Sequence, residues 1–133
     1  LVEPDLKDTT FLVGILHRIG EYVRMKIAPD LMSAFLNPRT KGNDKSHLEH
    51  YLFKTKSEQL GGYLLHFWGF PLSIIEGVLN HDDPEKLMES DFSPACAVYI
   101  ANSILSGKAV NEEFAAHFDL ESTLAVLEQN HQV

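Results

Sequence analysis

The chain has 133 residues, of which 44% are hydrophobic and 23% charged, as expected for one ordinary globular domain. Nineteen Asp and Glu against eleven Lys and Arg give a formal net charge of −8. This charge argues against nucleic acids and anionic membranes as partners, because both bind clustered basic residues. No segment approaches the roughly 20 apolar residues of a membrane-spanning helix, and no signal peptide is visible. We therefore expect a cytoplasmic protein.

The single cysteine, Cys96, excludes an internal disulfide. It lies in the apolar stretch 94–98, which predicts a small buried side chain in preference to a reactive nucleophile. A lone cysteine is also compatible with a reducing compartment. The first residue is Leu1 and not Met, so we expect a fragment, or the C-terminal part, of a longer protein.

The periodicity of the first third of the chain predicts helices. Apolar residues recur at the i, i+3/i+4, i+7 spacing of one buried helix face over residues 10–28. Pro29 is suited to the first turn of a short helix that extends through Leu36. Residues 37–45 contain proline, glycine, asparagine and three basic residues, which predicts a solvated loop.

A long helix is predicted over residues 47–67, with Ser46 as its N-cap. Gly61 and Gly62 lie inside this helix. Each glycine costs about 1 kcal/mol relative to alanine in a helix interior. The pair therefore indicates either close packing against another helix or a kink.

The second half of the chain continues with shorter helices. Gly69 and Pro71 predict the end of one helix and the start of the next. The remaining predicted elements are a helix over 72–80, a polar turn over 81–85, a helix over 93–105 capped by Ser93, a short helix from Asn111 to His117, and a last helix over 121–129. No strand pattern is present, so the prediction is one all-α domain over residues 1–133, a compact multi-helix bundle.

The histidines are the first place to look for chemistry, because imidazole binds metals and transfers protons near neutral pH. The seven histidines are His17, His47, His50, His66, His81, His117 and His131. His47 and His50 are three residues apart and share a helix face, but they lack partners at matching spacing. We interpret that pair as part of a solvated face.

Four blocks of sequence carry a family resemblance. The blocks are Phe11 to Gly20, which contains Leu-His-Arg-Ile-Gly, then Glu58 to Pro71, which contains Gly-Gly-Tyr-Leu-Leu-His-Phe-Trp-Gly-Phe-Pro, then Ile74 to Pro84, which contains Asn-His-Asp-Asp-Pro, and Ala97 to Leu105. In order and spacing they resemble the HDOD family, the HD-related output domains, over about residues 9–106. The resemblance implies a helical fold like that of HD domains.

Catalytic HD enzymes hold metal ions with His and Asp side chains, and the resemblance shows which positions differ here. The positions that correspond to the metal site are His17, Arg18, Ser57, Asn80, His81 and Asn102; we call them the HD positions. Arg18 and Asn102 replace aspartates, while Ser57 and Asn80 replace histidines. A cation repels a metal ion, and two neutral imidazoles bind hard divalent cations poorly. We therefore expect no catalytic residue, no metal and no cofactor.

His17 and His81 also have ordinary structural explanations. His17 is interpreted as a core histidine that a hydrogen bond satisfies, with Trp68 as a candidate neighbour. His81 lies at a predicted helix end, where it would interact favourably with the helix dipole.

The resemblance implies a non-catalytic output or regulatory interaction domain of a bacterial signalling protein, such as a response regulator. The expected partner is another protein or an adjacent receiver, GGDEF or EAL domain. Aromatic residues at helical spacing usually face inward. If they are instead exposed, Trp68, Phe70 and Pro71, together with Tyr63 and Phe67, are the first candidate interaction surface.

Two alternatives stay open. The first is a divergent metal-dependent phosphohydrolase that acts on a nucleotide or cyclic dinucleotide, with His17, His81, Asp82 and Glu58 as its site. The second is a sensor that binds a nucleotide without hydrolysing it, with Arg18 paired to a phosphate in place of the lost metal.

Overall fold

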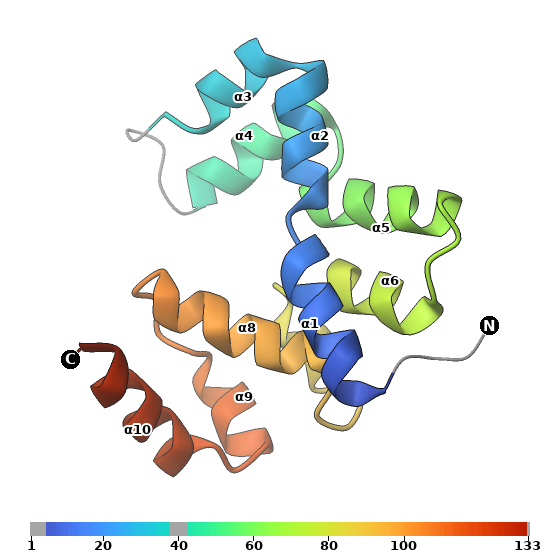
Figure 1. Ribbon diagram of the computed structural model, residues 1–133. Coiled ribbons are helices and arrows are strands. Elements are labelled where there is room, and N and C mark those ends of the chain that lie inside the picture. Colours follow the sequence, from blue (N-terminus) through green and yellow to red (C-terminus); the bar gives the residue numbers. More distant parts are fainter. Residues whose placement is uncertain (1–4, 38–42, 133) are drawn as a thin grey trace.

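The computed structural model describes residues 5–37 and 43–132, which form ten helices and no strand (Figure 1). The helices are α1 (Leu6–Leu16), α2 (Ile19–Ile27), α3 (Pro29–Phe35), α4 (Asn43–Phe53), α5 (Ser57–Phe67), α6 (Leu72–Asn80), α7 (Pro84–Leu87), α8 (Pro94–Leu105), α9 (Glu112–His117) and α10 (Glu121–Gln132). The predicted all-α class is confirmed. In the described part of the chain, no helix combines the length and apolarity that crossing a membrane requires.

The single helix predicted over residues 10–28 is wrong, because α1 and α2 are separate helices. The backbone N–H of His17 donates to the Val13 carbonyl and ends α1. Arg18 then precedes α2 with non-helical dihedral angles. The break allows α2 to approach α5 so closely that a Cβ atom on Gly20 would lie 2.0 Å from the Ser57 carbonyl oxygen. The apolar periodicity continues across residues 17 and 18, so the sequence pattern gives no sign of the break.

The helix predicted over residues 47–67 is also two helices, α4 and α5. Lys54 has a φ of 62°, a left-handed conformation that a continuous helix does not contain. Ser46 is not an N-cap, because it lies inside α4. The predicted loop 37–45 correspondingly ends earlier, since α4 starts at Asn43; residues 38–42 lie outside the described part of the chain.

Buried Arg24 accounts for the break between α4 and α5. Its side chain is 3% exposed, and its Nη1 donates to Glu49 Oε1 at 2.6 Å. Its Nη2 donates to the Thr55 carbonyl, and the guanidinium lies over the Phe53 ring, 4.1 Å from the centroid. These contacts come from α2, so one buried cation of α2 holds both α4 and the turn that follows it.

The two glycines of α5 allow close packing, one of the two predicted explanations. A Cβ atom on Gly61 would lie 3.1 Å from Ile19 of α2, and one on Gly62 would lie 2.5 Å from Leu79 of α6. The predicted stop and restart is confirmed, because Gly69 has a φ of 80° and Pro71 directly precedes α6 as its N-cap.

The helices α7, α8 and α9 begin at capping residues, and among these elements the structure differs from the prediction at the polar turn alone. The predicted polar turn 81–85 contains the start of α7, because Asp83 Oδ1 accepts from the Lys86 N–H at 3.1 Å and caps that helix. The helix from Pro94 to Leu105 is confirmed as α8, with Ser93 at its N-cap position. Asn111 caps α9 as predicted, with Oδ1 accepting from Phe114 N–H at 3.0 Å.

Two hydrophobic cores share α8. The first core joins α1, α5 and α6 to α8 through Val13, Leu65, Ile74, Ile75, Val78 and Val98. The second joins α7, α8, α9 and α10 through Leu87, Ala95, Cys96, Tyr99, Ile100, Val110, Phe114, Ala115 and Leu124. The predicted burial of Cys96 is confirmed, since its side chain is fully enclosed.

Candidate functional site

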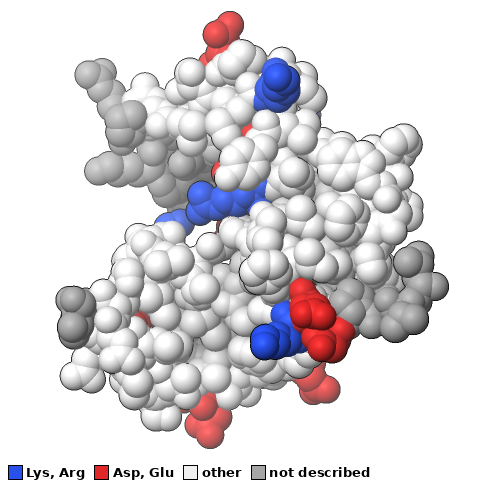
Figure 2. Space-filling model, in the orientation of Figure 1, with Lys and Arg blue, Asp and Glu red and all other residues white. Residues whose placement is uncertain are grey.

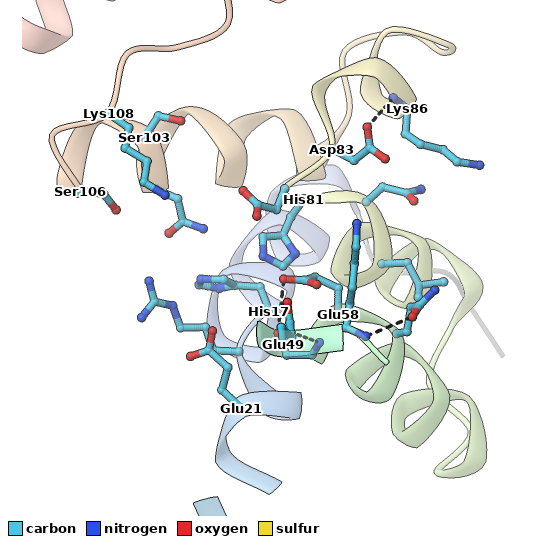
Figure 3. A pocket seen from close by; sticks show the side chains of 18 of the residues that line it. His17, Glu21, Glu49, Glu58, His81, Asp83, Lys86, Ser103, Ser106 and Lys108 are labelled. Atoms are coloured by element: carbon cyan, nitrogen blue, oxygen red, sulfur yellow. Dashed lines mark hydrogen bonds between the residues drawn. The ribbon is translucent and has the colours of Figure 1, made fainter. Parts of the chain in front are cut away.

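A pocket of about 630 Å³ lies where the junction of α1 and α2 meets the ends of α6 and α8 (Figure 3). Its lining consists of His17, Arg18, Glu21, Phe35, Leu36, Glu49, Lys56, Ser57, Glu58, Gln59, Leu79, Asn80, His81, Asp82, Asp83, Lys86, Asn102, Ser103, Ser106 and Lys108. All six HD positions are in this lining. Residues from four separate blocks of sequence are therefore brought to one pocket by the fold.

The two histidines of the pocket lie against each other. Their ring centroids are 4.9 Å apart and their planes meet at 71°. His17 Nδ1 lies 2.6 Å from the Gly14 carbonyl oxygen, and His81 Nδ1 lies 2.7 Å from the Val78 carbonyl oxygen. Because a carbonyl only accepts, both Nδ1 atoms carry the proton and donate. In each neutral ring Nε2 is then the acceptor nitrogen.

These hydrogen bonds can be compared with the structural roles that the sequence suggested for His17 and His81. His17 does make the predicted hydrogen bond, but the ring beside it is His81, and Trp68 lies largely exposed. His81 caps the C-terminus of α6 and bonds a carbonyl of its last turn, as predicted for a helix-end histidine. Nε2 of His17 is buried and has no hydrogen-bond partner among the described residues.

Burial lowers the pKa of His17 from its ordinary value of 6.5. The hydrogen bond to the Gly14 carbonyl opposes this shift, whereas the neighbouring His81 and Arg18 reinforce it. Burial disfavours a charged imidazole because the surrounding protein solvates the charge less well than water. His17 is therefore a neutral imidazole at pH 7.

Charged side chains of both signs line the rest of the pocket. Its cations are Arg18, Lys56, Lys86 and Lys108, and its acids are Glu21, Glu49, Glu58, Asp82 and Asp83. Figure 2 shows Lys and Arg side chains at the notch beneath the upper lobe formed by α2, α3 and α4. The three lysines lie far apart in the chain and belong to no motif, so no pattern in the sequence points to them.

Two of these acids are already engaged within the protein. Glu49 Oε1 pairs with Arg24 and also accepts from the Ser57 N–H at 3.0 Å. Asp83 caps α7. The carboxylate of Glu49 thus links the buried cation of α2 to the first residue of α5, at the edge of the pocket.

The pocket residues do not fit a divalent metal ion. In the part of the chain that the structure describes, no three His, Cys, Asp or Glu side chains lie close enough together to hold one. The lining instead includes Arg18, a permanent cation. Asp82 and Glu58, which the phosphohydrolase alternative requires, line the pocket without completing a set of ligands around His17 and His81.

A family model described as the HDOD domain matches residues 2–84, which is more than half of the 133 residues. The chain belongs to the HDOD family. HDOD domains are HD-related output domains associated with signalling. Searches of curated proteins and of solved structures found no match.

The HDOD match ends within the site. His17, Arg18, Ser57, Asn80 and His81 lie inside the matched residues, whereas Asn102 lies beyond them. Lys86 and Lys108 also come from the segment after residue 84. The pocket is therefore built jointly by the HDOD-matched region and by α7 and α8, which follow it.

The aromatic residues near the end of α5 are divided between surface and core. Tyr63, Phe67 and Trp68 are 69%, 76% and 55% exposed, so their interpretation as core residues is wrong; we call these three the aromatic patch. Phe70 and Pro71 are half-buried, and Phe70 packs against the first core. Tyr63 and Phe67 are four residues apart and share one helix face. The helix packs through its other side, where the two glycines lie.

The pair His47 and His50 lies outside the pocket. Both side chains are exposed on α4, and neither contributes to the pocket lining. Their interpretation as a solvated face is consistent with this placement.

Proposed function

We propose that this HDOD domain is a non-catalytic regulatory output domain of a bacterial signalling protein, such as a response regulator, and that it acts in the cytoplasm. The observation that carries the proposal is the presence of Arg18 and Asn102 in a pocket where the HD pattern has aspartates. Metal-dependent phosphoryl chemistry needs anionic ligands to hold the metal that activates water. A guanidinium at this place disfavours that metal electrostatically.

The proposed output is contact with a protein, either a separate partner or an adjacent receiver, GGDEF or EAL domain. Support comes from the aromatic patch, which exposes Tyr63 and Phe67 on one face of α5 and Trp68 at its C-cap. Tyr and Trp are enriched among residues that dominate binding energy at interfaces. The patch consists of residues that do not line the pocket, so contact and ligand binding would use different surfaces.

The non-catalytic part is tested by metal analysis of the purified protein together with phosphodiesterase and nucleotide hydrolysis assays in added Mn²⁺. We expect no stoichiometric Fe, Mn or Zn and no hydrolysis. The variants His17→Ala and His81→Ala serve as site variants, with exposed His50→Ala as the matched control. Stoichiometric metal that both site variants lose and the control retains would overturn the proposal and favour the phosphohydrolase.

The contact part is tested by a photo-crosslinking residue placed at Phe67 in the full-length protein. We expect a defined cross-link to another domain or to one partner protein. Phe92 is the matched control, since it is an exposed phenylalanine that follows α7. Equal cross-linking from Phe67 and Phe92 would show that the aromatic patch is not a specific contact surface.

A further inference from the structure

We infer that the pocket binds a nucleoside phosphate without a metal ion, with Arg18 as the principal phosphate ligand. The inference rests on the proposed function in one respect, namely that no catalytic metal occupies the pocket. Arg18 is exposed and lies at the junction of α1 and α2. Its planar guanidinium presents paired donors that match two oxygens of one phosphate.

The cations of the pocket are free to bind an anion. None of Arg18, Lys56, Lys86 and Lys108 forms an ion pair with a residue that the structure describes; the pair found there joins Arg24 to Glu49. Glu49 is neutralised by Arg24, so the four cations share the lining with four other carboxylates, those of Glu21, Glu58, Asp82 and Asp83. The charges of the lining thus balance although the chain as a whole has a charge of −8, and the four cations remain available to an anionic ligand.

The cations also come from four separate places in the chain. Arg18 precedes α2, Lys56 precedes α5, Lys86 is in α7 and Lys108 follows α8. Four cations from four elements in one concave pocket can surround a ligand, which a row of lysines on one helix cannot do. Their convergence is a property of the tertiary structure.

The remainder of the lining suits the uncharged part of a nucleotide. Leu36 and Leu79 contribute exposed apolar side chains to the lining, and Phe35 contributes a largely buried one; a base can pack against the exposed pair. The volume of about 630 Å³ lies within the roughly 300–1,000 Å³ of small-molecule sites. A bare phosphate would leave these apolar side chains in contact with water.

His17 supplies a reason to expect a ligand with a hydroxyl or amino group. Its Nδ1 is occupied by the Gly14 carbonyl, and its Nε2 is a buried acceptor without a partner. Buried polar atoms in native proteins are nearly always hydrogen-bonded, so an unsatisfied one calls for an explanation. Because protein atoms cover this nitrogen in the structure, a hydroxyl of the ribose or an amino group of the base would satisfy it once the covering side chains move, which a fully ionised phosphate cannot do.

Isothermal titration calorimetry tests the inference with ADP, GDP and cyclic di-GMP, each in excess EDTA. We expect at least one to bind, and Arg18→Glu to weaken that binding at least tenfold, because it replaces a phosphate donor with a repelling carboxylate. The affinity of Arg18→Lys should lie between those of the unmodified protein and Arg18→Glu, since lysine keeps the positive charge but lacks the paired donors of arginine. Lys26→Glu is the matched control, because Lys26 is exposed on α2 and does not line the pocket.

Two outcomes would overturn the inference: no binding of any of the three nucleotides to the unmodified protein, or binding that Arg18→Glu leaves as tight as Lys26→Glu does. Both variants change exposed side chains, and equal unfolding midpoints would show that both are folded. Nucleotide recovered after the titration is checked for hydrolysis with and without Mn²⁺. Hydrolysis would overturn the proposed non-catalytic function, whereas loss of binding alone would overturn only the inference made here.

Discussion

The rings of His17 and His81 lie edge to face at a centroid distance of 4.9 Å, yet each ring is oriented by a carbonyl of its own helix. A histidine held through Nδ1 presents Nε2 to whatever occupies the adjacent space. Around these two rings the chain places Arg18 and three lysines in the same pocket. The pocket therefore offers an anion four cations that form no ion pair with a described residue, whereas it offers a metal ion no cluster of three ligands in the described part of the chain.

The first prediction concerns the pH dependence of stability. The pKa of His17 is lowered in the folded protein, so the unfolded chain takes up this proton more readily. The free energy of unfolding should therefore fall as the pH decreases through the ordinary value of 6.5 toward the lowered folded pKa. His17→Asn, whose amide can still donate to the Gly14 carbonyl, does not titrate.

Urea unfolding at about pH 7.5 and about pH 5.5 measures this contribution. All other titrating groups are present in both proteins, so the difference between the two losses isolates His17. We expect the loss of stability on acidification to be smaller in His17→Asn than in the unmodified protein. Equal losses of stability in the two proteins would contradict a lowered pKa for His17 in the folded protein.

The second prediction concerns Gly20, where α2 meets the start of α5. Gly20→Ala should destabilise the protein by about 3 kcal/mol, because the added Cβ would lie 2.0 Å from a backbone oxygen of Ser57, which cannot rotate away. Gly14→Ala is the matched control, since a Cβ there has no neighbour within 4 Å. It should stabilise the protein by about 0.5–1 kcal/mol. Midpoints of thermal unfolding that shift in the same direction for both variants would contradict the close packing of Gly20 against Ser57.

The third prediction concerns the buried ion pair between Arg24 and Glu49. Glu49→Gln and Arg24→Met should each cost about 3–5 kcal/mol, because each leaves the partner's charge, which is 3% exposed at Arg24 and 16% exposed at Glu49, without its counterion. The double variant should lose less than the sum of the single losses, by about 1–3 kcal/mol. Glu21→Gln, at a half-buried carboxylate outside this pair, should change stability by less than about 0.5 kcal/mol. A double-mutant cycle in urea that gives strictly additive losses would show that the two residues are not coupled.

The fourth prediction compares two phenylalanines. Phe67→Ala should change the free energy of unfolding by less than about 0.5 kcal/mol, because the ring is mostly exposed. Phe114→Ala should cost about 3–5 kcal/mol, because that ring is fully buried in the second core, against Tyr99 and Phe118. A large loss of stability in Phe67→Ala would mean that the aromatic patch has a structural role, and would weaken its assignment as a contact surface.

Elements whose signals act within one turn were predictable from the sequence. Pro29, Pro94 and Asn111 start helices where they were expected to, and Gly69 adopts the left-handed conformation that a helix end favours. The resemblance that selected the six HD positions also rests on local blocks, and a family match covers five of those positions. The fold class and the candidate positions thus follow from residues that are close together in the chain.

The tertiary structure decided where the long predicted helices break, which charges meet, and which aromatic side chains stay outside. In the sequence Arg24 resembles any surface arginine, and only the return of α4 makes it a buried cation that ends that helix. Lys56, Lys86 and Lys108 become one site with Arg18 only when four distant segments converge. Capping and periodicity act over a few residues, whereas burial and charge pairing depend on which distant segments the fold brings together.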